Sequence, residues 1–469
     1  MIAIKFGTDG WRGVIADDFT FANARIVGQA VARYVVRCED ARKGVIVGYD
    51  HRFASDGIAV TVAEVLSSSS IPVWLTDKPC PTPAVSLLVR QRAAAGGLMI
   101  TASHNPYQWN GIKYKASYGS SALPSIVAQI EKELASVLQQ NVPPLPPRKD
   151  LIQHLDPRAP YLDTIERLVD WKKLRDAKFR FVSDAMHGCA AGLLPELFKR
   201  NGIVCDEIRG TRDPRFCGVH PEPIEPHIEA LRVAVLAGKY DVGLCADGDG
   251  DRIGAIDRDG TFVNPHQIFA LLLWHLAGTR NLPGDIAKTF SVTKLIDKLA
   301  AKFGRKLHET PIGFKYICEL MLEQSILIGG EESGGIGTNL YIPERDATVC
   351  ALFLAEIMAW HRKSLGELLA VLHAEFGEYH YGRVDLDVTP AQKEKAIAHF
   401  SDKKVTRLLD WPIVRREDMD GIKIYLGEIG WVMVRASGTE NLLRVYCETS
   451  KPETTSRVLA AVTQLVHSL

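Results

Sequence analysis

The amino-acid sequence predicts an α/β protein of several successive units, followed by a smaller α+β domain. Its 469 residues exceed the size at which one hydrophobic core keeps growing, so several domains are expected. Short apolar runs alternate with helix-periodic segments over most of the chain, which is typical of largely parallel sheets covered on both faces. The final stretch, beyond residue 380, instead gathers its strands before one terminal helix.

The composition is that of an ordinary globular protein and argues against several partners. Hydrophobic residues make up 46% and charged residues 24%, and 56 basic side chains balance 56 acidic ones. A net charge of zero argues against a nucleic acid or a membrane surface as the main partner. The nine cysteines are dispersed without a Cys-x-x-Cys pair, which suits a reducing compartment. With no membrane span and no signal peptide in the sequence, we expect a cytoplasmic protein.

The first unit is expected to alternate helices and strands up to a stiff connector. Its helices fall at 22–37, 56–67 and 125–138, and its strands at 44–50, 71–76 and 96–100. In the first helix, apolar residues recur at helical spacing, as at Ala22, Ile26 and Ala30. Four prolines between Pro143 and Pro147 form the connector and mark a domain boundary.

The same alternation resumes after the connector and again after residue 260. The expected helices are 160–170, 190–201, 227–237, 265–277, 292–303 and 346–363, and the expected strands are 179–184, 203–207, 241–246 and 325–329. In the last domain, 381–388 and 422–434 are rich in strand formers and 452–467 is helical. The chain shows no clean sequence repeat between its units.

The stretch TASHNP, from Thr101 to Pro106, directly follows the expected strand at 96–100. Asn-Pro stops regular structure and starts a turn. Ser103 is therefore expected to lie exposed on a loop at the carboxyl end of a strand, where open α/β sheets bind ligands. Taken alone, the stretch fits a plain polar turn better, but three further stretches favour a functional site.

Asp247, Asp249 and Asp251 are separated by glycines and follow the expected strand at 241–246. Three carboxylates at this spacing can fold around one hard cation such as Mg²⁺, and without a cation at least one pKa should rise. An EF-hand would need Gly and Glu where this chain has Arg252 and Arg258. A solvated acidic turn remains the alternative, and a metal site is the better interpretation.

A third loop, GGEESGG at 329–335, follows the strand at 325–329. Its glycines let the backbone approach a ligand, while Glu332 and Ser333 offer acceptors and a donor suited to sugar hydroxyls. A nucleophile elbow is excluded because Glu331 stands where such an elbow requires glycine. Taken alone, the loop could also be a flexible turn.

The fourth loop follows an apolar run that ends at Val434 and contains Arg435, Ser437, Gly438 and Thr439. An arginine, two hydroxyls and an open backbone form an anion-binding nest. No segment matches a P-loop, which argues against a nucleotide enzyme of that class. The four loops together favour metal-assisted phosphoryl transfer on a small phosphorylated polyol.

Near the N-terminus, FGTDGWRG (residues 6–13) places glycines around an aspartate and Arg12. The glycines indicate a tight loop that approaches another group closely. A plain turn explains the stretch equally well until a partner for Arg12 is found.

The loops that contain Ser103, Asp247, Glu332 and Arg435 occur in the order and at the separations found in the α-D-phosphohexomutase superfamily. The chain resembles that superfamily over its whole length, and most closely its phosphoglucomutase/phosphomannomutase branch. The resemblance implies three similar mixed-sheet α/β domains and a C-terminal α+β domain around a central cleft. The implied domains are 1–148 with the phosphoserine loop, 149–257 with the metal loop, 258–370 with the sugar loop and 371–469 with the phosphate loop. It also implies a monomer or homodimer.

The implied activity is interconversion of hexose 1-phosphate and hexose 6-phosphate, with glucose and also mannose as the hexose. Ser103 would be a phosphoserine, and Mg²⁺ would be held by its phosphate and by Asp247, Asp249 and Asp251. Hexose 1,6-bisphosphate would be the intermediate and activator.

The same matching assigns the remaining roles. Lys113 is the candidate general base or acid, and Arg12 and His104 would neutralise charge in the transition state. The substrate-binding residues are Lys315, Arg252, Glu332, Ser333, Arg435, Ser437, Gly438 and Thr439.

Several details of the sequence bear on the substrate. Some bacterial relatives carry histidine directly after the glycine that corresponds to Gly313, whereas this chain has Phe314 there, followed by Lys315, which resembles the glucose-type branch. Glu331-Glu332-Ser333 is likewise closer to glucose and mannose mutases than to phosphoglucosamine mutases. Phosphoglucosamine mutase remains the first alternative. A sugar-phosphate-binding protein without turnover is disfavoured because Ser103 and the three aspartates are all present, and a phosphatase would have little use for a second phosphate site.

Overall fold

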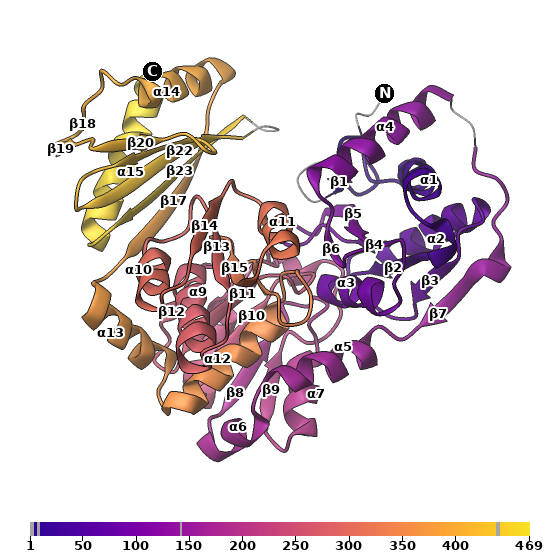
Figure 1. Ribbon diagram of the computed structural model, residues 1–469, viewed down its shortest axis with the longest axis horizontal. Coiled ribbons are helices and arrows are strands. Elements are labelled where there is room, and N and C mark those ends of the chain that lie inside the picture. The colour runs from indigo at the N-terminus through magenta and orange to yellow at the C-terminus, as the bar shows by residue number, and fades with distance from the viewer. Residues whose placement is uncertain (1–3, 7–9, 141–142, 438–440) are drawn as a thin grey trace. The chain divides into compact units, whose positions relative to one another are not determined.

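The chain folds into two compact units in the computed structural model, which describes residues 4–6, 10–140, 143–437 and 441–469. The larger unit comprises the chain up to residue 286 together with 313–368, and the smaller unit comprises 287–312 and 369–469. Figure 1 labels their helices and strands. The division into four domains at 148, 257 and 370 stays a prediction.

The first sheet of the larger unit has the order β1-β5-β4-β2-β3-β7, with β6 paired to β5 (Figure 1). Its strands are β1 (Trp11–Val14), β2 (Val45–Tyr49), β3 (Val73–Thr76), β4 (Gly96–Ile100), β5 (Trp109–Ala116), β6 (Ser120–Ser121) and β7 (Ile152–Leu155). Strands β4, β2, β3 and β7 are parallel, as the alternation predicts, but β5 is antiparallel to β4. The connection between β4 and β5 is too short for a crossover helix, so the chain turns back on itself.

Four helices accompany this sheet: α1 (Phe21–Cys38), α2 (Ser55–Ser68), α3 (Thr82–Gln91) and α4 (Pro124–Gln140). The hydroxyl of Thr20 accepts a hydrogen bond from the Asn23 N–H and caps the start of α1. Apolar faces of α1 and α2 pack on the sheet, as shown by the fully buried Val31 and Val62. The sequence predicted α1, α2 and α4 but missed α3, because its early prolines resemble a helix breaker although proline is favoured in a first turn.

The second sheet has the order β12-β11-β10-β8-β9. Its strands are β8 (Phe181–Asp184), β9 (Cys205–Ile208), β10 (Val242–Ala246), β11 (Ile253–Asp257) and β12 (Phe262–Val263), accompanied by α5 (Arg158–Ile165), α6 (Trp171–Ala177), α7 (Leu193–Arg200) and α8 (Glu229–Gly238). Strands β8, β9 and β10 are parallel, and β11 turns back antiparallel to β10. This sheet therefore repeats the mixed pattern of the first.

The remainder of the larger unit is organised around a buried helix. Its elements are α9 (Pro265–Leu273), α11 (Phe314–Glu323), β15 (Ile326–Gly330), β16 (Ile336–Thr338) and α12 (Ala347–His361). Strands β15 and β16 pair antiparallel, with Ile328 opposite Thr338. Helix α12 is apolar on all sides because it packs against α6, α9, β10 and β11 at once.

The smaller unit contains an antiparallel sheet of order β17-β23-β22-β21-β20. Its elements are β13 (Asp285–Thr289, which begins in the larger unit), α10 (Leu295–Lys302), β14 (Leu307–Thr310), α13 (Leu365–Phe376, which crosses between the units), β17 (His380–Asp387), α14 (Pro390–Ser401), β18 (Arg407–Leu408), β19 (Trp411–Pro412), β20 (Arg415–Glu417), β21 (Ile422–Tyr425), β22 (Gly430–Ala436), β23 (Leu442–Thr449) and α15 (Pro452–Ser468). Residues such as Val434, Val445 and Val462 form its core between the sheet and helices α14 and α15. The predicted α+β class is confirmed for this part of the chain.

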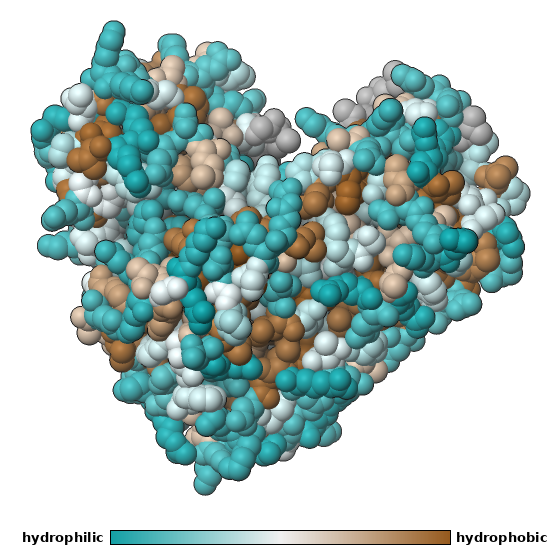
Figure 2. Space-filling view, viewed as in Figure 1, coloured by the Kyte–Doolittle hydropathy of each residue, from teal (hydrophilic) through white to brown (hydrophobic). Residues whose placement is uncertain are grey.

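The surface is mixed, and large apolar side chains such as Phe53, Leu145 and Val204 are exposed on it. Figure 2 shows mostly hydrophilic residues on the face in view, with hydrophobic residues in small groups. Within the described residues, no helix is both long and apolar enough to span a membrane.

A buried ion pair ties the first sheet to the segment that precedes α12. Lys115 on β5 places its Nζ 2.6 Å from Oε2 of Glu344, and both side chains are fully buried. The Ser86 hydroxyl donates to the same carboxylate oxygen at 2.8 Å. Because each charge has lost its water, each depends on the other for stability.

We expect Lys115→Met to destabilise the larger unit by about 3–5 kcal/mol, because it leaves Glu344 buried without its cation. Thermal unfolding followed by calorimetry measures the loss. The double variant Lys115→Met/Glu344→Leu should recover most of the melting temperature, and Lys172→Met, which breaks an exposed pair with Asp176, should leave it nearly unchanged. A single variant as stable as the wild type would contradict this account.

Candidate active site

Ser103 lies just past the carboxyl end of β4, as predicted, but it is not exposed. Its side chain is only 2% accessible. The loop that follows β10 covers it so closely that a Cβ added to Gly248 would lie 2.6 Å from the Ser103 carbonyl oxygen. The prediction of an exposed serine was wrong because it considered one strand end alone, whereas a second loop closes over it.

The three aspartates of the covering loop form one cluster. Asp247, Asp249 and Asp251 are fully buried, and each offers a carboxylate oxygen within 4.8 Å of the others. The Ser103 hydroxyl donates to Oδ2 of Asp247 at 3.1 Å. The phosphorylatable serine and the predicted metal ligands therefore share one site.

Burial of three carboxylates together has a large electrostatic cost. Burial, with repulsion from Asp249 and Asp251, raises the pKa of Asp247 well above its usual value. Burial would also raise the pKa of Asp249, but Lys113, together with Thr82 and Arg345, outweighs it and holds that pKa below the usual value. The expected rise of at least one pKa is thus present in this cluster.

Two buried cations offset this charge. Lys113 on β5 donates from Nζ to Oδ2 of Asp249 at 2.8 Å and to Oδ2 of Asp251 at 3.2 Å. Arg345, which follows β16, donates from Nη2 to Oδ2 of Asp251 at 2.7 Å. Because Lys113 comes from β5 and Arg345 from the segment between β16 and α12, the carboxylate cluster joins three parts of the larger unit.

The cluster fits a hard divalent cation. Oδ1 of Asp249 and Oδ1 of Asp251 are buried and accept no hydrogen bond from any residue that the structure describes. Unpaired buried carboxylate oxygens are costly unless a cation meets them, and carboxylates are the ligands that Mg²⁺ prefers. We therefore place the candidate metal site at these oxygens and at the adjoining Ser103.

Arg12 contacts the serine loop from β1, and His104 belongs to that loop. Arg12 on β1 donates from Nη1 to Oδ1 of Asn105 at 2.5 Å, which supplies the partner that the sequence left open. Burial, together with Arg252 and Arg12, holds the pKa of His104 well below its usual value. The imidazole is therefore neutral at pH 7 and offers a hydrogen bond rather than a positive charge.

The sugar loop connects to the metal loop through Arg345. Its Nη1 donates to Oε2 of Glu331 at 3.1 Å, and burial raises the pKa of Glu331 to about 7 although Arg345 opposes the shift. Glu332 and Ser333 are half-buried in the turn between β15 and β16. The backbone N–H of Ile253, at the start of β11, donates to the carbonyl of Gly334 at 3.1 Å and fixes that turn beside the metal loop.

Two other predicted substrate residues also belong to the larger unit. Arg252 follows the metal loop and donates from Nη1 to Oε1 of Glu222 at 2.9 Å. Lys315 is half-buried in the first turn of α11, with Nζ 5.1 Å from the centre of the Tyr316 ring. The backbone N–H of Arg252 donates to Oδ1 of Asp247 at 3.1 Å, so this residue contacts the aspartate cluster through its main chain while its guanidinium pairs with Glu222. The substrate-binding roles of Arg252 and Lys315 stay predictions.

The phosphate loop belongs to the smaller unit. Arg435 on β22 donates from Nε to Oδ1 of Asp420 at 2.8 Å. The Ser437 carbonyl accepts a hydrogen bond from Lys393 Nζ at 3.1 Å. Gly438 and Thr439, also predicted to bind phosphate, lie outside the described residues.

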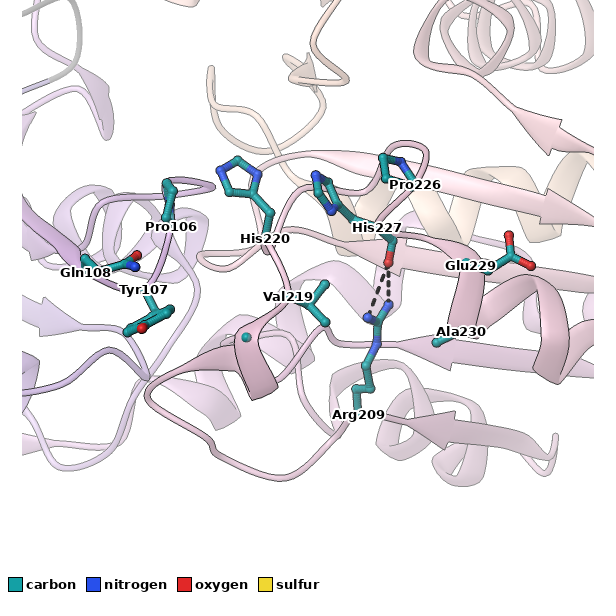
Figure 3. Close-up of a pocket in the computed structure, with 11 residues that line it drawn as sticks. Pro106, Tyr107, Gln108, Arg209, Val219, His220, Pro226, His227, Glu229 and Ala230 are labelled. Carbon is teal, nitrogen blue, oxygen red and sulfur yellow. Dashed lines mark hydrogen bonds between the residues drawn. The ribbon is translucent and has the colours of Figure 1, made fainter.

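A pocket of about 500 Å³ opens beside the serine loop. Figure 3 shows that Pro106, Tyr107 and Gln108 line one side and that His220 and His227 lie close together on the other. The two imidazole centres are 5.0 Å apart, and His220 lies 6.2 Å from the ring of His104. The pocket thus reaches the neighbourhood of Ser103.

Sequence reasoning missed several residues of the site. Thr82 donates to Oδ2 of Asp249 at 2.5 Å, Arg345 bridges two loops, and the fully buried Arg52 binds the main chain of the serine loop. Arg52 had a signal, since it follows β2 in the same strand–loop position as the other motifs. Thr82 and Arg345 had none, because no glycine or acidic pattern marks them.

Sequence profiles of one family match four successive parts of the chain. They are described as phosphoglucomutase/phosphomannomutase α/β/α domain I at residues 3–141, domain II at 159–260, domain III at 264–376 and C-terminal domain at 388–465. Together they cover most of the sequence.

Individual relatives agree with this match. A phosphoglucomutase/phosphomannomutase of Thermococcus kodakarensis is 29% identical over 96% of this chain and 95% of its own, and a phosphoglucosamine mutase of Carboxydothermus hydrogenoformans is 30% identical over 99% of each. The crystal structure of a protein described as a phosphomannomutase from Thermus thermophilus superimposes with a TM-score of 0.88 at 32% identity, over 99% of both chains. The chain is therefore an enzyme of the α-D-phosphohexomutase superfamily and belongs to its phosphoglucomutase/phosphomannomutase family.

Proposed function

We propose that this enzyme interconverts hexose 1-phosphate and hexose 6-phosphate, with glucose and also mannose as the hexose. Ser103 would carry the phosphoryl group, and hexose 1,6-bisphosphate would be the intermediate. The observation that supports this most is the 3.1 Å contact between the Ser103 hydroxyl and Asp247 within the buried carboxylate cluster. A serine so placed can hold a phosphate next to a metal site and away from water.

The reaction would take place in two transfers. In the first, a sugar hydroxyl attacks the phosphoserine, its proton leaves to a base, and the phosphorus–oxygen bond to Ser103 breaks to give the bisphosphate. In the second, the intermediate has turned over, and its other phosphate returns to Ser103. The net reaction moves one phosphoryl group between two oxygens of the same sugar and regenerates the phosphoserine.

The chain's own residues would supply position, charge and a proton path. Lys113 lies beside the cluster through its contacts with Asp249 and Asp251, where its Nζ can relay the hydroxyl proton. Arg12 supplies positive charge and His104 a hydrogen bond to the transferring group. A bound Mg²⁺ would offset the negative charge of the phosphate at Asp247, Asp249 and Asp251.

Glucosamine phosphate is the second candidate substrate, because several relatives at 29–31% identity are named phosphoglucosamine mutases. Distant fold relatives include an Aspergillus fumigatus N-acetylphosphoglucosamine mutase solved with GlcNAc-6P and magnesium. Against this stands the Glu331-Glu332-Ser333 turn, whose half-buried Glu332 and Ser333 would face the sugar hydroxyls. A coupled assay of glucose, mannose and glucosamine 1-phosphates, each with its bisphosphate activator, decides between them: turnover of glucosamine phosphate alone would overturn the proposal.

Ser103→Ala should fold normally yet lose nearly all mutase activity, because it removes the hydroxyl that is proposed to carry the phosphate. It should also lose any adduct of about 80 Da in the intact mass, since phosphorylation adds that mass. Steady-state assay and mass spectrometry measure the two effects. Ser68→Ala, on α2, is the matched control and should keep both; near-normal turnover by the Ser103 variant would refute the mechanism.

Asp249→Asn should weaken the dependence on Mg²⁺ and reduce turnover together, because one anionic ligand is lost. Titration of activity with Mg²⁺ measures the shift, and Ca²⁺ should support activity poorly because it is larger and less strict in its geometry. Asp259→Asn, in the turn after β11, is the control with unchanged metal dependence. Full wild-type activity in excess chelator would contradict a metal role.

Arg435→Ala should raise KM and also lower kcat, because we expect Arg435 to bind the phosphate that is not reacting. Loss of one charge-assisted contact corresponds to about 1.5–3 kcal/mol, or roughly ten- to a hundred-fold in kcat/KM. Arg415→Ala, which breaks an exposed pair with Glu417 in the same sheet, serves as the control. Ser103 should still become phosphorylated, and a kcat/KM within about twofold of wild type would remove Arg435 from the phosphate site.

A further inference from the structure

A fully buried arginine lies under the serine loop and takes no part in the chemistry proposed above. Arg52 follows β2 and has no accessible surface. Its Nε lies 3.1 Å from Oδ2 of the equally buried Asp50, and its Cζ lies 4.9 Å from the centre of the Phe216 ring. A buried guanidinium is costly unless its donors are paired, so the remaining partners of Arg52 indicate its role.

Those partners are four main-chain carbonyl groups of the turn between β4 and β5. Nη2 donates to the carbonyl oxygens of Ser103 and Asn105, both at 2.6 Å. Nη1 donates to those of Pro106 and Trp109, at 2.9 and 3.0 Å. One side chain therefore binds the turn at the serine and again where β5 begins. The planar fork of a guanidinium can do this, whereas an ammonium group presents its donors from a single point.

The serine itself needs such support. Ser103 has a φ of +54°, in the left-handed region that residues with a Cβ rarely adopt. Its N–H donates to the Thr101 hydroxyl at 2.9 Å, while Arg52 binds its carbonyl oxygen. Both the N–H and the carbonyl group of Ser103 are therefore hydrogen-bonded. A residue with a Cβ keeps a positive φ only where the surrounding structure enforces it.

We propose that Arg52 is a positioning residue for phosphoryl transfer: it holds the main chain of Ser103 so that Oγ faces Asp247. Arg52 bonds to the serine's carbonyl and not to its hydroxyl, so it does not touch the reacting atoms. The inference rests on the proposed function, because it assumes that Ser103 carries the phosphate.

Misplacement of a reacting group by about 1 Å can cost on the order of a hundred-fold in rate. The predicted sugar and phosphate ligands lie on other loops, so substrate binding should change little when Arg52 is replaced. Replacement of Arg52 should therefore lower kcat and the rate of Ser103 phosphorylation, while KM stays nearly constant.

The test compares Arg52→Gln and Arg52→Lys with a matched control. Arg158 also donates to two main-chain carbonyls, those of Ala191 and Gly192, and pairs with Glu196, but its loop holds no proposed site residue. Arg158→Gln therefore removes a similar set of contacts away from the serine. Calorimetry establishes that each protein is folded before its kinetics are measured.

In Arg52→Gln, kcat should fall by about a hundred-fold, with KM within about twofold of wild type. The rate at which glucose 1,6-bisphosphate phosphorylates Ser103, which intact mass measures, should fall by a similar factor. Arg52→Lys keeps the charge and should recover about tenfold of this loss, because it restores some of the bonds. The ³¹P resonance of the phosphoserine should shift in both variants and not in Arg158→Gln.

Three results would overturn the inference in an active enzyme. They are a folded Arg52→Gln with unchanged kcat and phosphorylation rate, a loss of activity that appears in KM alone, and a loss that Arg158→Gln matches at equal stability.

If Arg52→Gln does not fold, Arg52→Lys is judged by the same criteria, and Phe216→Leu, which removes only the ring contact, should cause a smaller loss in kcat at constant KM. A wild-type chain without mutase activity would instead overturn the proposed function, and this inference with it.

Discussion

The structure of the larger unit depends on the burial of three carboxylates in one loop. Asp247, Asp249 and Asp251 lie within reach of a single ion and have no accessible surface, so their mutual repulsion must be offset locally. Lys113 and Arg345 bring that positive charge from two other parts of the fold. The need to offset this charge therefore joins separate parts of the larger unit and creates a candidate site for a hard cation. It also accounts for the buried side chains of Lys113 and Arg345 beside the proposed phosphoserine.

The motif loops share one structural origin. Each connects a strand to its antiparallel neighbour, as the pairs Ile100 with Ile112, Ala246 with Ile253, Gly330 with Ile336 and Ala436 with Leu443 show. In the three loops of the larger unit, a short connection between paired strands has both ends fixed by the sheet, so its side chains are placed more rigidly than those of a long crossover loop. This suits phosphoryl transfer, in which positioning and charge stabilisation do most of the catalytic work.

Membership of the family explains the common chemistry and leaves the sugar to be identified by the proposed assay. In the proposed mechanism, the buried cluster around Ser103 would bind phosphate, a group that glucose, mannose and glucosamine phosphates have in common. Discrimination between sugars must come from groups that face the hydroxyls, for which Glu332, Ser333 and Lys315 are the candidates. These side chains are only half-buried.

The sequence by itself determined the α/β class and many of the helices and strands, because periodicity is a local property, but it missed others such as α11, α14 and β5. The chemistry that it assigned to the motif loops stays a prediction. Only the tertiary structure decided that Ser103 is buried, that Arg12 bonds to Asn105, and that Arg345 bridges Asp251 and Glu331. The short β4–β5 connection also decided the mixed sheet. Contacts between distant residues have no local signature, and neither burial nor the partner of a charge can be determined before the sheets are assembled.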